Sequence, residues 1–306
     1  MNIRYSLIIP VYNSAGILTE LFGRIRRVMQ QTGESWELLL VDDGSTDQSW
    51  SVIEAMKGES SEAITGIKLS GNFGQHNASL CGMAHASGDI IITMDDDLQM
   101  VPEDIPKLLE CYHSGEFDLV YGWFPDKKHS VTRNTGSRIL KRSGKLFKGG
   151  PGEGSSFRVF SRDLAVQILG HAQSFVFIDE LLLWYTDSIG FVALQHYSRK
   201  SGKSGYSNIR LFKITANIVM YYSALPLRIM TWGGFACSII SFLIGIYYII
   251  RKIFFQVPAG YTSIIVAILF STGIIILCLG IIGEYLNRIY MVQNRKPPFR
   301  VKKILK

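Results

Sequence analysis

Two long stretches without a single charged residue lie toward the end of this 306-residue chain, and they limit what it can fold into. They cover residues 231–250 and 262–283. Each is long enough to cross a hydrocarbon core of about 30 Å as a helix. Buried helices of soluble proteins seldom run this far without a charge. We therefore expect two transmembrane helices, at about 229–251 and 261–283, in preference to two core helices.

The distribution of basic residues predicts how these helices are oriented. Arginine and lysine are frequent after the second stretch, whereas the loop between the stretches holds only Arg251 and Lys252. The positive-inside rule then places both ends of the chain in the cytoplasm, with the helices in the inner membrane. The start of the chain has a short strand pattern and no long apolar segment, so we expect nothing to translocate the first 225 residues.

Before these stretches, short apolar runs alternate with helical patterns. Strand patterns occupy residues 4–10 and 36–42, and a helical pattern covers residues 15–31 between them. This alternation is typical of an α/β fold with a mostly parallel sheet and helices on its faces. No G-x-G-x-x-G motif follows the first strand, which argues against a dinucleotide-binding fold. Ser45 and Gln48 have the spacing of a capping box, so a helix is expected to start at Ser45.

The chain is thus expected to have four parts. An amphipathic helix is predicted in the membrane interface just before the first apolar stretch, because apolar residues alternate there with polar ones. The expected parts are an α/β domain at 1–205, the interfacial helix at 206–226, the transmembrane helices within 227–290, and a basic cytoplasmic tail at 291–306.

One predicted strand, Ile90 to Thr93, is followed closely by three consecutive carboxylates. Open α/β sheets bind ligands at the C-terminal ends of their strands. If the segment stays extended, Asp95, Asp97 and Gln99 lie on one side and Asp96 points away. Carboxylate and amide oxygens suit Mg²⁺ or Mn²⁺, which often share them with substrate phosphates. The alternative is an acidic strand end that is only solvated.

Two other predicted strands also end in polar motifs. Residues 10–13 read PVYN and residues 42–45 read DDGS. A carboxylate at such a strand end can accept the imide N–H of a pyrimidine, and Tyr12 can lie against the base. Asp42 has an alternative role, compensation of charge at a helix N-terminus. His76, a lone histidine in a polar turn, is more often a surface or capping residue than a catalyst.

Two segments are rich in basic residues. Residues 126–148 include Arg133 and Arg138 and have no acid after Asp126, which suits anionic lipid headgroups as well as a solvated face. Residues 199–207 combine Arg199, Lys203 and Ser204 with glycines, as in phosphate-binding loops, although a solvated linker has the same composition. Membrane helices and the lack of interleaved aromatics make a nucleic-acid partner unexpected.

Taken together, the motifs resemble a known family. In chain order they are PVYN at 10–13, DDGS at 42–45, NFGQHNA at 72–78, DDDLQ at 95–99, FR at 157–158 and R-x-x-G-x-S at 199–204. This order is similar to that of the membrane-anchored polyprenyl-phosphate glycosyltransferases of glycosyltransferase family 2. These include bactoprenol glucosyltransferases, undecaprenyl-phosphate aminoarabinose-type transferases and dolichyl-phosphate mannose synthases. The resemblance covers nearly the whole chain.

The resemblance implies a GT-A fold, inversion at the anomeric carbon, and roles for individual residues. Asp43 would read the nucleotide base, and the cation and diphosphate would be held after the fourth strand. Two departures remove a charge each: Gly71 and Gly205 stand where Arg and Lys are usual. The implied catalytic residues are Asp95, Asp97, Arg158 and Arg199; the nucleotide-binding residues are Pro10, Tyr12, Asn13, Asp42, Asp43, Asp95 and Asp96; the metal ligands are Asp95, Asp97 and Gln99; and the acceptor-phosphate residues are Arg133, Arg138, Arg199, Lys203 and Ser204.

The implied reaction moves a sugar from a nucleotide diphosphate, expected to be a UDP-sugar, to polyprenyl (undecaprenyl) phosphate at the cytoplasmic membrane face. Glycines in the apolar stretches favour packing into a homo-oligomer such as a tetramer. Two other classes stay open. A processive polysaccharide synthase would carry Q-x-x-R-W, but the segment from Gln195 to Arg199 lacks the Trp and has one residue too many. A non-catalytic nucleotide-binding module would not require the acidic array.

Overall fold

The computed structural model describes residues 3–59, 63–123, 155–170, 177–195, 260–293 and 297–306, with separate residues between 230 and 254. The chain divides into two compact units. The first unit comprises Met1–Tyr206 together with Lys296–Lys306, and the second comprises Ser207–Arg295.

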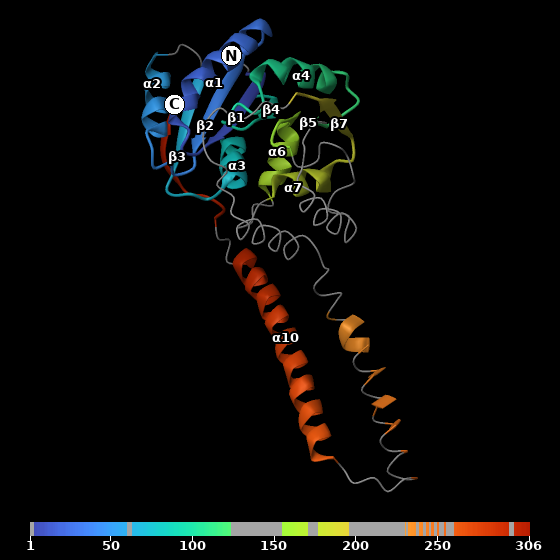
Figure 1. Cartoon of the computed structure of the whole chain (residues 1–306). Helices are drawn as coiled ribbons and strands as arrows, with labels where there is room; N and C mark the ends of the chain where they lie inside the picture. The colour runs from blue at the N-terminus through green and yellow to red at the C-terminus, as the bar shows by residue number, and fades with distance from the viewer. Residues whose placement is uncertain are drawn as a thin grey trace. The chain divides into compact units, whose positions relative to one another are not determined.

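In the described residues of the first unit, eight strands form one sheet in the order β7-β5-β6-β4-β1-β2-β3-β8 (Figure 1). The central strands β4, β1, β2 and β3 are parallel, so the expectation of a mostly parallel sheet is confirmed. β6 and β8 are antiparallel to their neighbours. The strands are β1 Tyr5–Val11, β2 Trp36–Asp42, β3 Ala63–Leu69, β4 Ile90–Thr93, β5 Leu119–Trp123, β6 Arg158–Ser161, β7 Ile189–Ala193 and β8 Val301–Leu305.

Helices cover both faces of this sheet because side chains alternate along its buried strands. Leu7 of β1 belongs to one apolar cluster, with α1, α2 and α4, whereas its neighbour Ile8 belongs to the other, with α3, α6 and α7. The helices of this unit are α1 Ala15–Gln31, α2 Ser49–Glu59, α3 Gln75–His85, the 3₁₀ turn η1 Pro102–Asp104, α4 Ile105–His113, α6 Arg162–Leu169 and α7 Ile178–Tyr185.

The start of α2 differs from the sequence prediction. The helix begins at Ser49 and not at Ser45, and the side chain of Asp47 binds its first residue. Asp47 Oδ1 accepts hydrogen bonds from the backbone N–H of Ser49, at 2.9 Å, and from its hydroxyl. The Ser45 hydroxyl instead accepts from the backbone N–H of Asn13 at 3.0 Å, which ties the turns after β1 and β2 together.

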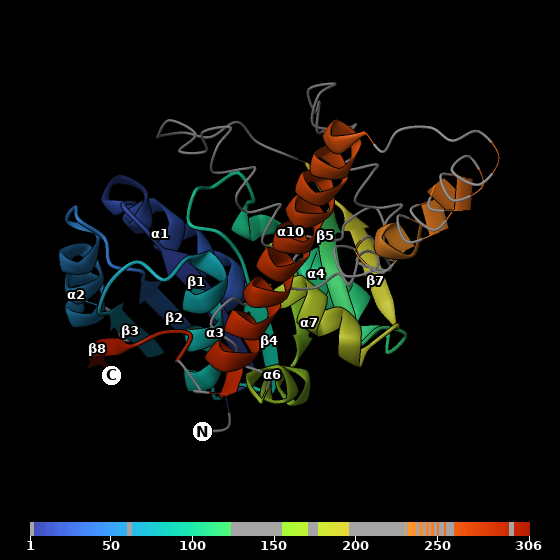
Figure 2. The same ribbon diagram turned by 90° about the horizontal axis from the view of Figure 1, so that it is seen from below.

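The end of the chain returns to the sheet. β8 lies along the outer edge beside β3 (Figure 2), and Arg300 O accepts a hydrogen bond of 2.9 Å from Ser70 N. Lys303 forms a 2.8 Å ion pair with Glu54 of α2. The sequence predicted only a basic tail here; the structure adds that five of its residues form a strand.

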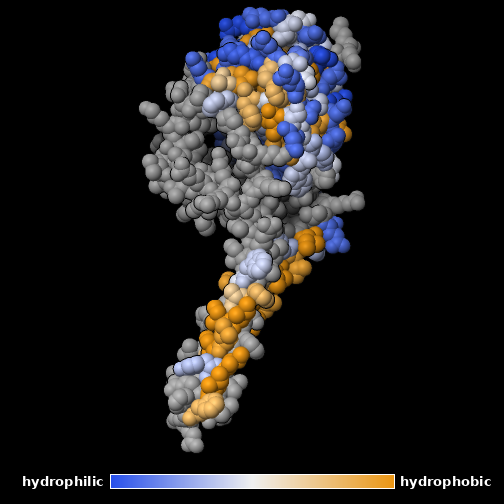
Figure 3. All heavy atoms as spheres, turned by 90° about the vertical axis from the view of Figure 1, so that its right-hand side faces the viewer, coloured by the Kyte–Doolittle hydropathy of each residue, from blue (hydrophilic) through white to orange (hydrophobic). Residues whose placement is uncertain are grey.

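The second unit contains the long helix α10, Tyr261–Gln293. Its described side chains are mostly hydrophobic (Figure 3). Within the described part of the chain, no helix meets the combined length and hydropathy needed to cross a bilayer. The two spans expected from the sequence therefore stay a prediction.

Candidate active site

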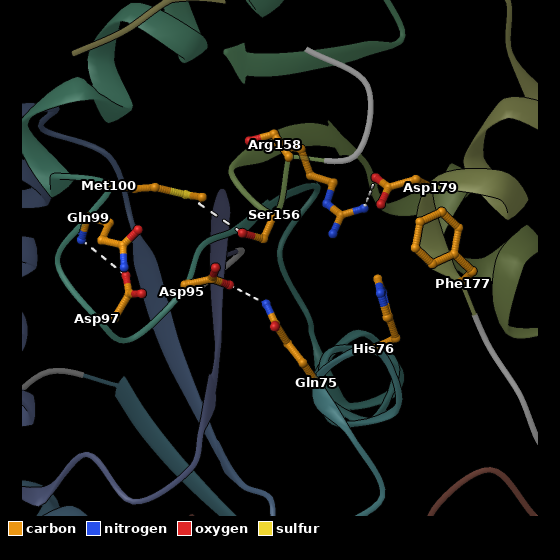
Figure 4. Close-up of a pocket in the computed structure, with 11 residues that line it drawn as sticks. Gln75, His76, Asp95, Asp97, Gln99, Met100, Ser156, Arg158, Phe177 and Asp179 are labelled. Carbon is orange, nitrogen blue, oxygen red and sulfur yellow. Dashed lines mark hydrogen bonds and ion pairs between the residues drawn. The ribbon is translucent and has the colours of Figure 1, made fainter. Parts of the chain in front are cut away.

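A cavity of about 220 Å³ lies beyond the C-terminal end of β4 (Figure 4). Four separate segments build it: the start of α3, the loop after β4, the residues around the start of β6, and the start of α7. It is lined by Gln75, His76, Asp95, Asp97, Gln99, Met100, Ser155, Ser156, Arg158, Phe177 and Asp179.

The loop after β4 brings Asp95, Asp97 and Gln99 to this one cavity. β4 ends at Thr93, and the following residues bend, with Leu98 in the left-handed region at φ 56°. The three side chains thus converge through a bend, and not through the alternation of an extended strand on which the prediction depended. Such a backbone conformation is costly for leucine and is often found at functional sites.

Asp96 does not line the cavity and instead contacts the turn after β1. Its Oδ2 accepts a hydrogen bond of 3.2 Å from the backbone N–H of Tyr12. This contact links the acidic loop to the segment that the sequence assigned to the nucleotide base. Asp96 therefore lies apart from Asp95 and Asp97, as expected, but has a structural partner.

Negative charge accumulates on this side of the cavity. The pKa of Asp95 is raised to about 6: burial contributes most, the charges of Asp97 and Asp96 act in the same direction, and a hydrogen bond from Ser156 and the Arg158 charge oppose them. Gln75 Nε2 donates to Asp95 Oδ1, and Gln99 N donates to Asp97 Oδ1 at 3.1 Å. A bound cation would relieve the repulsion between these carboxylates.

The residues present fit a divalent cation of the hard type. Among the described residues, no three His, Cys, Asp or Glu side chains are grouped to hold a metal by themselves. Mg²⁺ usually binds to one or two carboxylates and takes its other ligands from substrate phosphates and water. Two carboxylates and an amide on one cavity wall match that pattern.

Arg158 lines the cavity but is not a free cation. It is 2% exposed, and its Nη1 donates to Asp179 Oδ1 at 2.6 Å. Its Nε donates to Thr93 Oγ1 at 3.0 Å, and the Tyr121 hydroxyl donates to the same Asp179 oxygen at 3.0 Å. This buried pair fixes the wall between β6 and α7. Asp179 thus neutralises the positive charge of Arg158, which we expected from the sequence to act on the substrate.

His76 also faces the cavity, contrary to the surface or capping position that the sequence favoured. Its ring packs against Phe177, with centroids 4.8 Å apart and planes tilted by 60°. The pKa of His76 is lowered to about 4, mainly by burial and also by the Arg158 charge, with the Asp179 charge opposing both. His76 is therefore neutral at pH 7.

The acids after β2 are used differently. Asp43 is 3% exposed, and its two oxygens accept the backbone N–H groups of Phe73 and Gly74 at 2.7 and 2.8 Å. Asp42 is fully buried and accepts from Ser45 N at 3.0 Å. Neither acid lines the cavity. Tyr12 remains 48% exposed at the same edge.

A family model described as Glycosyl transferase family 2 matches residues 6–169, which include Asp95 and Asp97 of this cavity. The chain belongs to glycosyl transferase family 2. A second model, the GtrB C-terminal hairpin, matches residues 225–289. This family 2 glycosyltransferase thus combines a glycosyltransferase domain with a C-terminal hairpin segment, in the order that the resemblance implied.

Curated relatives of this glycosyltransferase align over nearly its full length. An undecaprenyl-phosphate 4-deoxy-4-formamido-L-arabinose transferase of Enterobacter sp. (strain 638) is 30% identical over 99% of this chain and 94% of its own. The protein of the same description from Salmonella paratyphi B is 31% identical over 99% and 94%. That from Shewanella sediminis is 31% identical over 98% and 92%.

Solved structures establish the fold. Glucosyl-3-phosphoglycerate synthase from Mycobacterium tuberculosis, in complex with Mn²⁺, UDP-glucose and phosphoglyceric acid, matches with a TM-score of 0.55 over 71% of this chain and 77% of its own. Its complex with UDP gives 0.54 over 71% and 78%. At 19% and 18% identity these likenesses show the α/β GT-A-like fold alone.

Several residues of the site were not assigned to it from the sequence, among them Asp179 and His76. Asp179 follows Ile178 at the start of a helix, where an acid usually only compensates the helix dipole. His76 had no charged neighbour in sequence; Arg158 and Asp179 approach it only in the fold. The predicted acceptor-phosphate residues lie outside the described part of the chain: Arg133, Arg138, Arg199, Lys203 and Ser204.

Proposed function

We propose that this glycosyltransferase moves a sugar from a UDP-sugar to polyprenyl phosphate, with inversion, at the cytoplasmic face of the inner membrane. The observation that carries the proposal is the cavity in which Asp95, Asp97 and Gln99 share one wall. The relatives' description as undecaprenyl-phosphate transferases supports the acceptor. The fold neighbour that holds Mn²⁺ and UDP-glucose supports the donor.

Asp95, Asp97 and Gln99 would hold Mg²⁺ or Mn²⁺ together with the donor diphosphate. A bound cation there supplies Lewis-acid stabilisation of the charge that develops on the leaving group. Gln75 orients Asp95 through its side-chain amide, and the backbone N–H of Gln99 orients Asp97. These contacts fix both carboxylates before the donor arrives.

The nucleotide would lie along the turns after β1 and β2. The exposed ring of Tyr12 offers a surface for the base, and Asn13 Oδ1 holds the adjacent turn by accepting from Thr46 N at 2.8 Å. Pro10 lies within β1, in register with Val41. Because Asp43 already binds Phe73 and Gly74, we assign it and Asp42 to shaping this surface, and not to direct contact with the base.

The acceptor needs no strong general base. A phosphate monoester has a second pKa near 6, so it is already an anion at neutral pH. The main difficulty is to bring this anion near the donor diphosphate. We assign that task to Arg199, Lys203 and Ser204, with Arg133 and Arg138 attracting the lipid headgroup, on the basis of the sequence.

Membrane attachment would come from the segment that matches the hairpin model. Both ends of the second unit continue into the first unit, which suits an even number of spans. Contiguous exposed apolar surface usually marks a membrane or protein contact. We therefore retain the spans at about 229–251 and 261–283, both ends of the chain in the cytoplasm, and packing into homo-oligomers. The exposed apolar side chains of α10 include Ile268, Ile275, Leu279, Ile282 and Leu286.

A donor panel tests the proposal. Purified full-length protein in detergent would receive labelled nucleotide sugars and a short polyprenyl phosphate, with MnCl₂ or MgCl₂. We expect one lipid-linked sugar per acceptor from a UDP-sugar, lost on chelation of the metal. A long polymer would indicate a processive synthase, and nucleotide binding without transfer from any donor would indicate a non-catalytic module.

A further inference from the structure

The side of the cavity away from the acidic loop has a distinct character. His76 and Phe177 lie together there, next to Arg158 and Asp179 (Figure 4). Arg158 and Asp179 carry opposite charges, are both nearly fully buried, and pair at 2.6 Å. His76 is neutral. Among the described residues, this wall therefore carries no net charge, whereas the opposite wall holds Asp95 and Asp97.

His76 differs from its neighbours in having no polar partner. Among the described residues, neither of its ring nitrogens takes part in a hydrogen bond, although Asp179 and Arg158 are both bonded. A neutral imidazole offers one donor and one acceptor. His76 is only partly buried, so both nitrogens stay open to the cavity that the ring lines. A ligand bound in this cavity can therefore supply their hydrogen-bond partners.

Phe177 packs against His76 and supports its ring at the cavity. It precedes α7, and its ring packs on the imidazole with centroids 4.8 Å apart. Gln75, the residue before His76, bonds Asp95 on the acidic wall. The start of α3 thus places one side chain on each wall of the cavity. A group held by the acidic wall through its diphosphate would carry its sugar toward His76.

We infer that His76, seated on Phe177, is a specificity-determining residue that hydrogen-bonds an uncharged polar substituent of the donor sugar. The inference rests on the proposed function and adds the class of sugar to it. A hydroxyl or amide group can satisfy both ring nitrogens. A carboxylated sugar would meet Asp179, Asp95 and Asp97, and the one Lys or Arg among the described residues that line the cavity, Arg158, is already paired. An ammonium group would find Asp179 occupied by Arg158.

The test compares full-length variants with the donor that the panel identifies. His76→Leu keeps packing against Phe177 but removes both nitrogens; His76→Gln restores a neutral donor and acceptor. We expect His76→Leu to lower kcat/KM by about 10- to 100-fold, mainly through the donor KM, and to change the preference among donors. His76→Gln should recover most of this. The matched control is His85→Gln, at the other end of α3 and outside the cavity.

Calorimetric titration separates recognition from general structural damage. UDP alone should bind His76→Leu as tightly as the unaltered protein, whereas the additional affinity of the intact UDP-sugar should be lost. A variant with unchanged donor KM, preference and UDP-sugar affinity would overturn the inference and leave the proposed function standing. UDP-glucuronate used as well as UDP-glucose would overturn the uncharged class. If the unaltered protein transfers sugar from no donor, both proposals fail.

Discussion

Two pairs of aspartates follow strands on either side of β1, yet the fold uses them in opposite ways. Asp42 and Asp43 come at the end of β2, and Asp95 and Asp97 follow β4; β1 lies between these strands. The backbone of residues 73 and 74 occupies both oxygens of Asp43. Asp95 and Asp97 line the cavity. One pair therefore holds the protein together, and the other is available to a ligand.

The difference arises from what folds over each pair. Gly44 has φ 70°, and a Cβ there would lie 2.6 Å from the backbone carbon of Gly71. The absence of a side chain thus lets the turn before α3 close over Asp43. After β4, Leu98 instead turns the loop so that its acids face open space. Aspartates at the same end of the sheet can therefore have a structural role or a ligand-binding role, depending on the segments that pack over them.

The largest effect is expected from Asp97→Ala. Loss of a proposed ligand should lower sugar transfer by about 1000-fold, because metal stabilisation of a leaving group is worth several kcal/mol. The melting temperature should not fall, since the change removes a repulsive charge from the cavity. Transfer assays and thermal unfolding of the same preparation measure both. Near-normal turnover would show that Asp97 is not part of the metal site.

Asp43→Ala should have the opposite pattern of effects: it should lower the stability of the fold, whereas Asp97→Ala lowers activity. Two buried N–H groups would lose their acceptor, at a cost of about 2–4 kcal/mol in the free energy of unfolding. Asp43→Asn keeps one acceptor and should lose roughly half as much. Denaturant titration measures both variants. If Asp43→Ala unfolds normally but no longer binds UDP, Asp43 contacts the nucleotide and the contrast between the two pairs disappears.

Glycine substitutions test why the turn closes over Asp43. Gly44→Ala should lower the free energy of unfolding by about 1–3 kcal/mol, because its φ is positive and the new Cβ meets backbone atoms. Gly71→Ala is the matched control: nothing lies within 4 Å of a Cβ at that position. Thermal unfolding should rank the two clearly. Equal effects would mean that the close approach at Gly44 is unimportant.

A smaller effect on the free energy of unfolding is expected from pH, through His76 in the cavity that Asp95 and Asp97 line. The folded protein keeps His76 neutral to about pH 4, whereas the unfolded chain protonates it near 6.5. Its contribution to stability is therefore present above pH 6.5 and lost as the pH falls toward 4, by on the order of 2 kcal/mol. Asp95, with a raised pKa, has the opposite sign.

The difference between the unaltered protein and His76→Leu isolates this histidine. Because Asp95 titrates in both proteins, its contribution cancels when their unfolding free energies are subtracted at each pH. The remainder should grow in favour of the leucine variant as the pH falls below about 6.5. A difference that is constant with pH would mean that His76 titrates normally in the fold.

Local patterns predicted much of this fold. The bounds of α1 and β2 match the expected ones, because each has a clear apolar period of its own. The predicted start of α2 was wrong because the Ser45 hydroxyl binds the backbone of Asn13, which is distant in sequence, and not the start of the helix. β8 has five residues and depends on the edge of β3, which lies far away in the sequence. No local pattern reveals such a pairing.

The site was predicted less completely, for the same reason. The acidic side chains are consecutive in sequence, so their strand alone suggested a binding edge. The opposite wall joins His76 of α3 to Phe177 and Asp179 of the α7 region, about a hundred residues further along. Their meeting depends on how the helices pack. The burial of Asp43 likewise depends on a turn from another part of the chain.

The position of β8 at the end of the sequence also determines when the sheet can be completed during synthesis. Its residues leave the ribosome after residues 207–295 have been synthesised, so β3 lacks its outer partner during that time. An open strand edge can pair with other chains. The nascent domain therefore passes through a stage at which it is vulnerable to aggregation, and the pairing of β8 with β3 ends that stage.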